Sequence, residues 1–444
     1  MKRENWTSKL GFIMAASGSA IGLGNIWRFP YITGTNGGAI FILIYLLIIF
    51  IIGYPLIISE MTIGRKTNKN PVGAFKTLAP ESSWWLLGTL GILSGFIILS
   101  YYSVVAGWSM AYIFKTFAGS SAEINFSEVF SSYTAEIAEP IFWHGVFMLL
   151  TILVISAGII KGIQKIVKIL MPLLFIIIII LIIRALLLPG AGKGLLFYLK
   201  PDFSHITIQT FTDAISQSFF TLSLGMGAMI TYGSYLSNAD NINDSAAYVI
   251  FFDTLFAVLA GFAIFPSVFA LGYNPSAGPG LTFITLPAVF AEMPLGNIFG
   301  SLFFVLIAIA ALTSSISLLE VIVAYVVDER GWGRKKAAQI IGFIIFLAGI
   351  PTVLGYSQFS NFSFLGMDVL DTYDWFANSI FLPLGGLLTA IFTGYVWQAK
   401  NVSLEANKGQ GFLKIGLWYG FLIKYIVPAA IFIILALNIW ITFQ

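Results

Sequence analysis

The sequence predicts an all-α, polytopic membrane protein. Of its 444 residues, 58% are hydrophobic and only 10% are charged, whereas a soluble domain is about a quarter charged and half apolar. The apolar residues form unbroken runs of about 20, the length with which an α-helix crosses a bilayer, and they do not alternate as in the strands of a membrane barrel. No polar segment between the runs is long enough to fold alone. We therefore expect one transmembrane unit over residues 1–444, surrounded by the lipid bilayer.

About eleven spans are predicted from these runs. They cover approximately residues 10–33, 39–63, 85–114, 141–160, 166–188, 211–235, 246–272, 296–327, 337–354, 372–397 and 415–442. Spans one to five (10–188) and six to ten (211–397) form two five-helix halves that enter the membrane from opposite sides. The last span (415–442) is additional to both halves.

Basic residues give the expected orientation, because lysine and arginine concentrate in cytoplasmic loops. Clusters of them precede the first span and follow the second, fourth, eighth and tenth: Lys2, Arg3 and Lys9; Arg65, Lys66, Lys69 and Lys76; Lys161, Lys165 and Lys168; Arg330, Arg334, Lys335 and Lys336; Lys400, Lys408 and Lys414. We expect a multi-pass protein of the cell membrane with a cytoplasmic N-terminus. An odd number of spans then leaves the C-terminus outside.

Composition and motifs exclude several functions. The chain has no cysteine, so disulfides and thiol chemistry are excluded. The two histidines, His144 and His205, have no metal-ligand spacing, and the net charge of +3 does not indicate a nucleic-acid partner. The sequence shows no nucleophile with its base, metal cluster or phosphate loop, so it does not predict an enzyme. Nothing in it implies an obligate protein partner.

The first span is interrupted where it should be a continuous helix. Residues 17–30, SGSAIGLGNIWRFP, combine three glycines with Asn25, Arg28 and Pro30. Glycine costs a helix roughly 1 kcal/mol relative to alanine, and a buried asparagine or arginine needs a partner. We interpret the segment as a broken helix whose free backbone groups bind a small ligand and a cation. The alternative is close helix packing through Gly18 and Gly22, a small-xxx-small pair.

The sixth span repeats this feature at the matching place in the second half. Residues 216–228, SQSFFTLSLGMGA, place polar groups and a Gly-Met-Gly sequence in mid-membrane. A pair of glycine-interrupted helices in two inverted halves indicates a transporter binding site. A third unusual segment is the apolar, proline-rich loop 273–295, which we expect to dip into the outer mouth as a cap.

These residues together resemble a known family, the neurotransmitter:sodium symporters. The resemblance rests on Trp6-Thr-Ser-Lys-Leu-Gly11, on the run from Gly18 to Pro30, and on motifs in the same order and spacing further along the chain: 60–65 (EMTIGR), 219–225 (FFTLSLG), 312–315 (LTSS) and 371–375 (DTYDW). It covers essentially the whole chain, and the length of eleven spans resembles the bacterial amino-acid transporters that lack a twelfth helix, of the tyrosine or multi-hydrophobic type. It implies the LeuT-type inverted repeat of five plus five helices, with helices 1 and 6 unwound at mid-membrane.

By this resemblance the chain binds two sodium ions, hard cations that prefer oxygen ligands. The first site would use Ala20, Asn25, Thr221 and Asp253, and the second would use Gly18, Ile21, Ala310, Thr313 and Ser314. Asp253 departs from the family's usual asparagine, and Ala257 stands where chloride-dependent relatives have serine. We expect the Asp253 carboxylate to supply the negative charge that chloride supplies elsewhere, so that no chloride is required. The alternative is a protonated aspartate bonded within the bundle.

The resemblance also places an amino-acid substrate. Amine transporters of the family carry an aspartate where this chain has Gly22, so the substrate is expected to bring its own carboxylate. The implied pocket has no charged side chain and suits aliphatic and aromatic L-amino acids: Ser19, Ala20, Leu23, Gly24, Ile98, Tyr102, Phe220, Ser223, Met226, Ser314 and Leu318. Ser19 replaces an asparagine, which leaves the amino-group contact open. Any single apolar residue of this set could equally be core packing.

Two gates are implied around this pocket. The outer gate would comprise Arg28, Gln217, Phe220 and Asp374, and the inner gate Arg3, Trp6, Ser234, Tyr235 and Asp328. Arg3 could equally be an ordinary positive-inside residue. Gly162 and Pro172, with nine residues between them, match a family pattern at which span five can unwind, although a plain proline kink is the alternative. Glu60 and Glu320 are expected to be buried structural acids.

The leading interpretation is sodium-coupled import of hydrophobic amino acids by alternating access. A proton-coupled transporter of the same fold is the first alternative, and the hydroxyl pair Thr313 and Ser314 favours sodium over it. A channel or a non-transporting amino-acid sensor would keep the pocket without its gates, and the two predicted gates favour a transporter.

Overall fold

The computed structural model describes residues 5–118, 125–274 and 280–442, and the regular elements in these ranges are helices. Nine of them are long and apolar enough to cross a membrane, and a bent pair in the first span makes ten. The remaining predicted span, 211–235, is divided into two shorter helices. The chain is therefore a polytopic α-helical membrane protein, as predicted.

The nine long spans follow the predicted order, and several contain a π-helical turn. They are α3 (Ala39–Ile48) with η2 (Ile49–Gly53) and α4 (Tyr54–Thr67); α6 (Trp85–Ala118); α8 (Ala138–Ser156); η3 (Ile159–Gln164) with α9 (Lys165–Leu186); α13 (Ile242–Ala270); α15 (Gly296–Arg330); α16 (Arg334–Leu354); α17 (Val369–Asp374) with η6 (Trp375–Phe381), α18 (Leu382–Ile391) and η7 (Phe392–Val396); and α20 (Leu417–Phe421) with η8 (Leu422–Ile426) and α21 (Val427–Thr442).

The first span is broken where the sequence places its glycines and asparagine. Helix α1 (Lys9–Ala20) ends at Ala20, and residues 21–22 leave the helical ladder. The chain resumes as η1 (Gly24–Arg28) and α2 (Phe29–Thr35), bent by 50° from α1. The break frees backbone carbonyls at the centre of the span, as a binding site would require.

The sixth span is broken in the same way. Helix α11 (Ile208–Thr221) is separated from α12 (Ala228–Gly233) by residues 222–227. Gly225 and Gly227 adopt φ of 78° and 75°, a region that glycine enters without steric cost. Alanine at Gly225 would also clash with the Leu382 backbone. The Gly-Met-Gly sequence therefore specifies the local unwinding.

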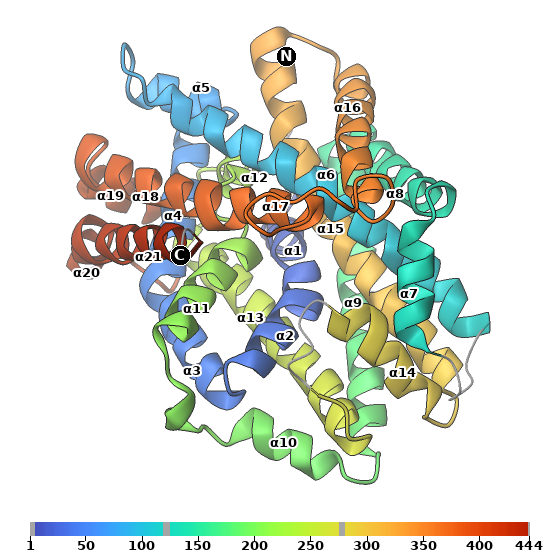
Figure 1. Cartoon of the computed structure of the whole chain (residues 1–444). Helices are drawn as coiled ribbons and strands as arrows, with labels where there is room; N and C mark the ends of the chain where they lie inside the picture. The colour runs from blue at the N-terminus through green and yellow to red at the C-terminus, as the bar shows by residue number, and fades with distance from the viewer. Residues whose placement is uncertain (1–4, 119–124, 275–279, 443–444) are drawn as a thin grey trace.

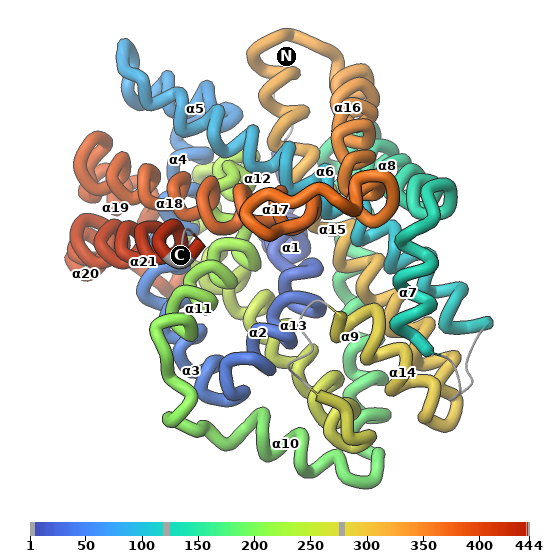
Figure 2. The backbone as a smooth tube through the Cα atoms, in the orientation of Figure 1, coloured from blue at the N-terminus to red at the C-terminus, as the bar shows by residue number. Residues whose placement is uncertain are grey.

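The two broken spans lie side by side near the centre of the molecule (Figures 1 and 2). Helix α1 packs against α13 and α15, α11 contacts η1, and α12 packs against α4 and α15. Long continuous helices thus hold both breaks in a buried interior, where their polar groups must find partners inside the protein.

Short helices cap the bundle at two opposite ends. Figure 1 shows α5 (Pro71–Leu78) and α19 (Ala399–Ala406) toward the upper left. It shows α7 (Phe126–Ala135), α10 (Ala191–Leu199) and α14 (Leu286–Ala291) toward the right and the bottom. This division agrees with the predicted alternation of the loops between two sides.

The loop between α13 and α15 dips inward as predicted. It forms η5 (Leu281–Thr285) and α14, and Phe283 of η5 is buried. The Phe283 ring stacks on Phe130 of α7 at 5.6 Å and meets Trp108 of α6 edge-on at 5.8 Å. The loop residues 275–279, with Pro275 and Pro279, lie outside the described residues.

Candidate functional site

A small cavity lies between the breaks of the two interrupted spans. Its volume is about 20 Å³, room for about one water molecule. Its lining contains all of the predicted substrate residues except Leu23, together with Gly22, and carries no charged side chain: Ser19, Ala20, Gly22, Gly24, Ile98, Tyr102, Phe220, Ser223, Met226, Ser314 and Leu318. The cavity must widen before it can hold an amino acid.

Polar groups from both broken spans and from α15 meet at one side of this cavity. The Ser19 hydroxyl donates to Ser317 Oγ at 2.7 Å, and the Ser223 hydroxyl donates to the Ser19 carbonyl at 3.2 Å. The Tyr102 hydroxyl accepts a hydrogen bond from the Leu23 backbone N–H at 3.1 Å. Leu23 therefore contributes its backbone to the site. Hydroxyls and backbone groups of both broken spans, α6 and α15 are therefore linked to one another beside the cavity.

The residues predicted for the second sodium site lie together beside the first break. Thr313 and Ser314 both donate to the Ile21 carbonyl at 3.2 Å, and Thr313 also donates to the Ala310 carbonyl at 2.9 Å. Gly18 faces Thr313 across α1 and α15, because a Cβ at Gly18 would lie 3.5 Å from Thr313 Cβ. The cluster supplies hydroxyls and carbonyls without a carboxylate, an oxygen set that suits a hard monovalent cation.

The predicted first site centres on Asp253 of α13, which is fully buried. Its Oδ1 accepts hydrogen bonds from the Asn25 amide and the Thr221 hydroxyl, both at 2.8 Å. Its Oδ2 has no hydrogen-bond partner among the described residues. A buried carboxylate oxygen without a partner is costly, so this donor set fits a bound cation. Asn25, Thr221 and Asp253 would hold it, and the Ala20 carbonyl remains a predicted fourth ligand.

A larger cavity of about 160 Å³ is lined in part by Phe130 of α7 and Phe283 of η5. Arg28 and Asp374 of the predicted outer gate line it, and Phe220 lines both this cavity and the inner one. In this structure Arg28 donates to Ser216 at 2.9 Å and to Gln217 at 3.3 Å. The Arg28 guanidinium also lies 5.5 Å from the centre of the Phe220 ring.

Asp374 has other partners across the cavity. It accepts hydrogen bonds from Tyr101 at 2.9 Å and from Asn378 at 2.6 Å. Gln217 in turn donates to the Gly24 carbonyl at 2.8 Å and so connects Arg28 to the first break. Three of the four predicted outer-gate residues, Arg28, Phe220 and Asp374, thus border one cavity, and the fourth, Gln217, is hydrogen-bonded to Arg28. Direct pairing of Arg28 with Asp374 stays a prediction.

Trp6, which is predicted for the inner gate, is buried against Tyr232 and Tyr235. Its indole donates to the Tyr232 carbonyl, its backbone N–H donates to the Tyr235 carbonyl, both at 3.2 Å, and its ring meets both tyrosine rings edge-on. The buried Ser234 lies between these tyrosines in the chain. Asp328 accepts from the backbone and side chain of Asn70 at 3.0 and 3.3 Å. Arg3 lies outside the described residues.

Several residues that support the site were not among the predicted site residues. Ser317 follows Ser314 by one helical turn, a spacing that could have indicated it. Glu60 accepts the Gly225 backbone N–H at 2.7 Å and so supports the second break. Glu320 forms a bidentate ion pair with Arg334 at 2.7 and 2.8 Å and accepts from Tyr235 at 2.7 Å. The predicted structural role of both acids agrees with these contacts.

Comparison with known proteins identifies a family of sodium-dependent transporters. The model of the sodium:neurotransmitter symporter family matches residues 3–137 and 136–444. An uncharacterized sodium-dependent transporter of Bacillus subtilis is 40% identical over 98% of this chain and 97% of its own length. A second one, from Methanocaldococcus jannaschii, is 34% identical over 96% of this chain and 89% of its own.

A solved structure is similar along the whole chain. The crystal structure of MhsT in complex with L-phenylalanine superimposes with a TM-score of 0.91, at 45% identity, over 98% of this chain and 99% of the other. The family consists of transporters and not of enzymes, and the likeness to MhsT extends to the LeuT-type architecture. This chain therefore belongs to the sodium:neurotransmitter symporter family, and it is a sodium-dependent, multi-pass membrane transporter with the LeuT-type fold.

Proposed function

We propose that this transporter imports hydrophobic L-amino acids, both aliphatic and aromatic, together with two sodium ions by alternating access. One observation carries the substrate class: the cavity between the two breaks is lined by backbone groups, hydroxyls and apolar side chains, with no charged side chain. A charged substrate side chain would be buried there without a partner, at a high free-energy cost.

The α-carboxylate and α-ammonium of the substrate would be held by the polar side of the cavity. The Gly24 backbone N–H and the Tyr102 hydroxyl would bind the carboxylate, with the first sodium ion beside it. Carbonyls near Ser19, Ala20 and Phe220 would accept from the ammonium. The L-phenylalanine in the MhsT complex supports this class of substrate.

Chloride independence follows, in this proposal, from Asp253. Its fixed negative charge would balance the first sodium ion, and Ala257, one turn further along α13, offers no hydroxyl to chloride. Uptake by the wild type should then be equal in chloride and in gluconate. Asp253→Asn should slow uptake strongly or make it respond to chloride. Uptake by this variant at the wild-type rate without chloride would contradict the role of Asp253.

Import also fixes the proposed orientation. The basic end of the bundle, with α5, α19 and the N-terminus, would face the cytoplasm, and α7, α10 and α14 would face outside. The C-terminus after α21 would then be extracellular. A protease site added at either terminus of the reconstituted protein would report which terminus the outer solution reaches.

Uptake of radiolabelled leucine, tyrosine and tryptophan into liposomes tests the function directly. We expect accumulation that requires an inward sodium gradient and exceeds equilibrium. Accumulation driven by a proton gradient alone would favour the proton-coupled alternative. Sodium-dependent binding without accumulation would favour a sensor, and labelled arginine and glutamate serve as non-substrates.

A further inference from the structure

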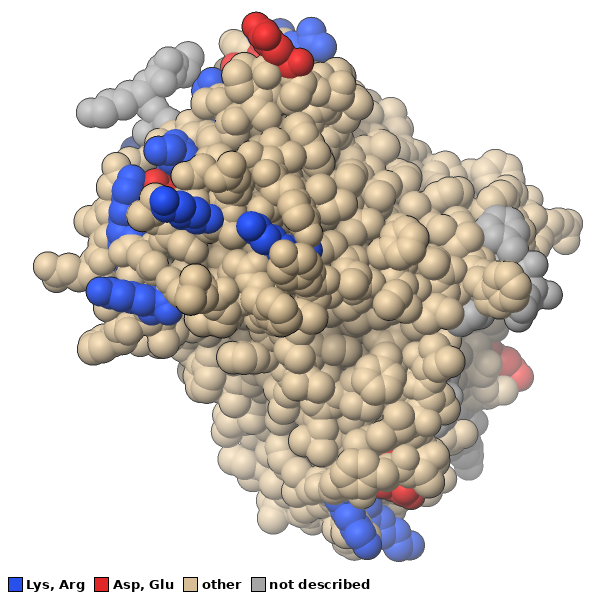
Figure 3. Space-filling view, turned by 90° about the vertical axis from the view of Figure 1, so that its left-hand side faces the viewer, with Lys and Arg blue, Asp and Glu red and all other residues tan. Residues whose placement is uncertain are grey.

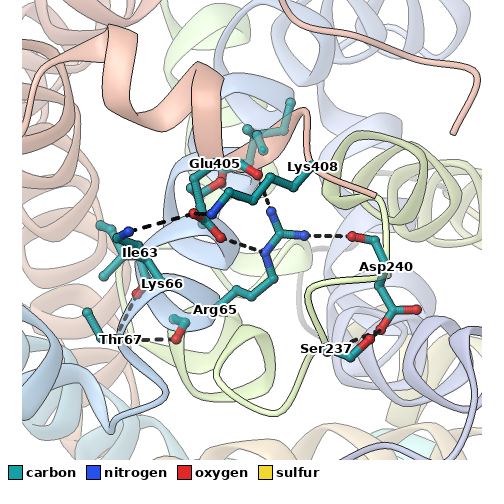
Figure 4. A network of polar contacts seen from close by, with 12 residues as sticks. Ile63, Arg65, Lys66, Thr67, Ser237, Asp240, Glu405 and Lys408 are labelled. Carbon is teal, nitrogen blue, oxygen red and sulfur yellow. Dashed lines mark hydrogen bonds and ion pairs between the residues drawn. The ribbon is translucent and has the colours of Figure 1, made fainter. Parts of the chain in front are cut away.

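A network of charged residues joins three cytoplasmic elements of the proposed topology (Figure 4). Arg65, at the end of α4, is buried and donates to the Glu405 carboxylate of α19 at 3.1 Å. Its other nitrogens donate to the Glu405 carbonyl and, at 2.6 Å, to the Asp240 carbonyl, which precedes α13. The Asp240 carboxylate accepts instead from Ser237 at 2.7 Å. Arg65 thus anchors α19 to the bundle.

The cations around this buried pair are exposed. Lys408 contacts the second Glu405 oxygen at 2.7 Å, and Lys66 lies 4.0 Å from the same oxygen. Both lysine side chains are 49% exposed, whereas Glu405 is only 4% exposed. One buried carboxylate therefore faces three cations, two of which keep much of their surface free for another anion.

The loop 407–416 that follows α19 is held firmly at its backbone. Asn407 accepts from the Ile415 N–H at 2.9 Å and donates to the Ile415 carbonyl at 2.8 Å. Asn243 donates to Asn407 at 2.8 Å and to the Leu413 carbonyl at 3.2 Å. Asp244 accepts from the Leu413 N–H at 2.9 Å. These bonds hold the backbone of the loop from inside the protein.

The same loop turns large apolar side chains away from the protein. Phe412 is 97% exposed and Leu417 is 96% exposed, the highest values for large apolar residues in the described chain. Lys414 between them is also exposed, as is Lys400 at the start of α19. Leu417 is the first residue of the last apolar span, so this surface stands at the edge of the bilayer.

Charge on this side of the molecule is predominantly positive. Figure 3 faces the side on which α19, α20 and α21 lie and shows Lys and Arg gathered toward one end, with little acid beside them. The middle of this face is uncharged, as a lipid-facing surface should be, and further charged residues lie at the opposite end. A basic rim next to exposed apolar side chains matches the chemistry of a phospholipid, an anionic head group attached to apolar chains.

We propose that this surface, the lysine corner, binds an anionic phospholipid of the cytoplasmic leaflet. Lys66 and Lys408, which flank one Glu405 oxygen, contact the head-group phosphate. Lys400 of α19 and Lys414 of the following loop add positive charge, and Phe412 and Leu417 insert among the acyl chains. The proposal rests on the orientation given under Proposed function. It goes beyond transport because it assigns a ligand to a surface that touches neither the substrate cavity nor the sodium sites.

Lipid binding to the purified full-length chain tests this proposal. Native mass spectrometry in detergent would titrate dioctanoyl phosphatidylglycerol, with dioctanoyl phosphatidylcholine and glycerol 3-phosphate as separate arms. We expect saturable binding of phosphatidylglycerol, weaker binding of phosphatidylcholine, and little competition from glycerol 3-phosphate, because the free phosphate lacks the chains that Phe412 and Leu417 would contact.

Matched variants assign the site. Replacing the four lysines of the corner by glutamine should weaken phosphatidylglycerol binding roughly fivefold for each lysine removed. The control K165Q/K168Q/K335Q/K336Q removes the same charge from other exposed basic positions and should bind like the wild type. F412S/L417S should weaken binding roughly tenfold or more by removing apolar contact.

Transport and oligomeric state distinguish lipid binding from misfolding and from dimerisation. All variants should keep sodium-driven uptake in phosphatidylcholine liposomes. If the variant with all four lysines of the corner replaced does not fold, K400Q/K414Q is used in its place. Equal weakening in corner and control variants, or unchanged binding in the corner variant, would overturn the site. Equal affinity for glycerol 3-phosphate, or a dimer that only the F412S/L417S change abolishes, would overturn the lipid as its occupant.

Discussion

Gly22 occupies a position in the substrate cavity where a side chain would meet two polar groups. A Cβ there would clash with Ser314 Oγ and approach the Tyr102 hydroxyl oxygen to 2.7 Å. Because Gly22 has no side chain, this position lacks the carboxylate that amine transporters of the family carry. The absence of a Cβ also lets the break after α1 approach α15 closely. This close approach brings the Ile21 carbonyl within reach of Thr313 and Ser314.

We expect Gly22→Ala to weaken sodium-dependent amino-acid binding. Overpacking of a tight site costs about 1–3 kcal/mol, which corresponds to a loss of roughly 5- to 150-fold in affinity. Scintillation proximity binding of labelled leucine would measure it. Gly192→Ala is the matched control, because a Cβ at Gly192 meets no atom within 4 Å. Equal affinity in the two variants would contradict the close approach.

Glu405 links stability to pH. Burial disfavours its carboxylate, but the hydrogen bond and charge of Lys408 and the charge of Arg65 outweigh burial and hold the Glu405 pKa below its ordinary 4.5. Because the pKa of Glu405 is lower in the folded than in the unfolded protein, its ionised carboxylate contributes fully to the free energy of unfolding above pH 4.5. This contribution is lost as the pH falls through the lower pKa of the folded state.

Glu405→Gln should therefore lower the thermal midpoint in detergent at pH 7, because breaking a buried ion pair costs about 3 kcal/mol. The difference from wild type should shrink as the pH falls from 5 towards 3. Glu136→Gln, at an exposed position, provides the control. A difference that stays constant with pH would show that the Glu405 charge is not what stabilises α19.

At the scale of elements, the broken helices were the most predictable part of the molecule. Glycine, asparagine and serine within an apolar run carry a local cost that sequence alone reveals, and both breaks fall at those residues. The π-helical turns and the Arg65–Glu405 pair were not predictable, since partners 340 positions apart leave no local pattern. The bend of the first span by 50° likewise depends on packing against α13 and α15.

The π-helical element η3 holds the N-terminal segment. Gln164 accepts from the Thr7 N–H at 3.2 Å and donates to the Thr7 hydroxyl at 2.5 Å, and its side chain packs on Gly11 of α1. The predicted unwinding site, Gly162 and Pro172, lies in the same region: Gly162 is within η3 and Pro172 is inside α9. We infer that Gln164 couples the start of α9 to the closed inner end.

Gln164→Met should loosen the N-terminal segment. Loss of two hydrogen bonds of about 0.5–1.5 kcal/mol each should raise amide exchange over residues 7–12 by roughly 5- to 150-fold. Hydrogen–deuterium exchange with mass spectrometry in sodium would measure it. Gln209→Met, on the exposed start of α11, should leave that segment unchanged. Similar exchange in both variants would remove the proposed coupling.

At the scale of the whole molecule, the two ends of the pathway differ. Trp6 fills the inner end, whereas a cavity of about 160 Å³ lies outside Phe220 and a cavity of about 20 Å³ lies beneath it. The sequence, through the family resemblance, predicts which residues form each gate, and this assignment stays a prediction. It could not predict which end is closed, because the same residues form both states and only their packing distinguishes them.

Alternating access predicts opposite changes at the two ends, and the cysteine-free chain allows a direct measurement. Leu370 lines the outer cavity and Ser234 is buried beside the inner tyrosines, so Leu370→Cys and Ser234→Cys report on the two ends. We expect sodium alone to speed maleimide labelling of the outer cysteine and slow that of the inner one. Leucine added with sodium should then slow the labelling of the outer cysteine as well, because Phe220 closes over the occupied cavity.

Ser204→Cys, at an exposed position, is the control and should be labelled at the same rate under all of these conditions. If sodium moved both rates in the same direction, the two ends would not open alternately, and alternating access would be wrong for this transporter.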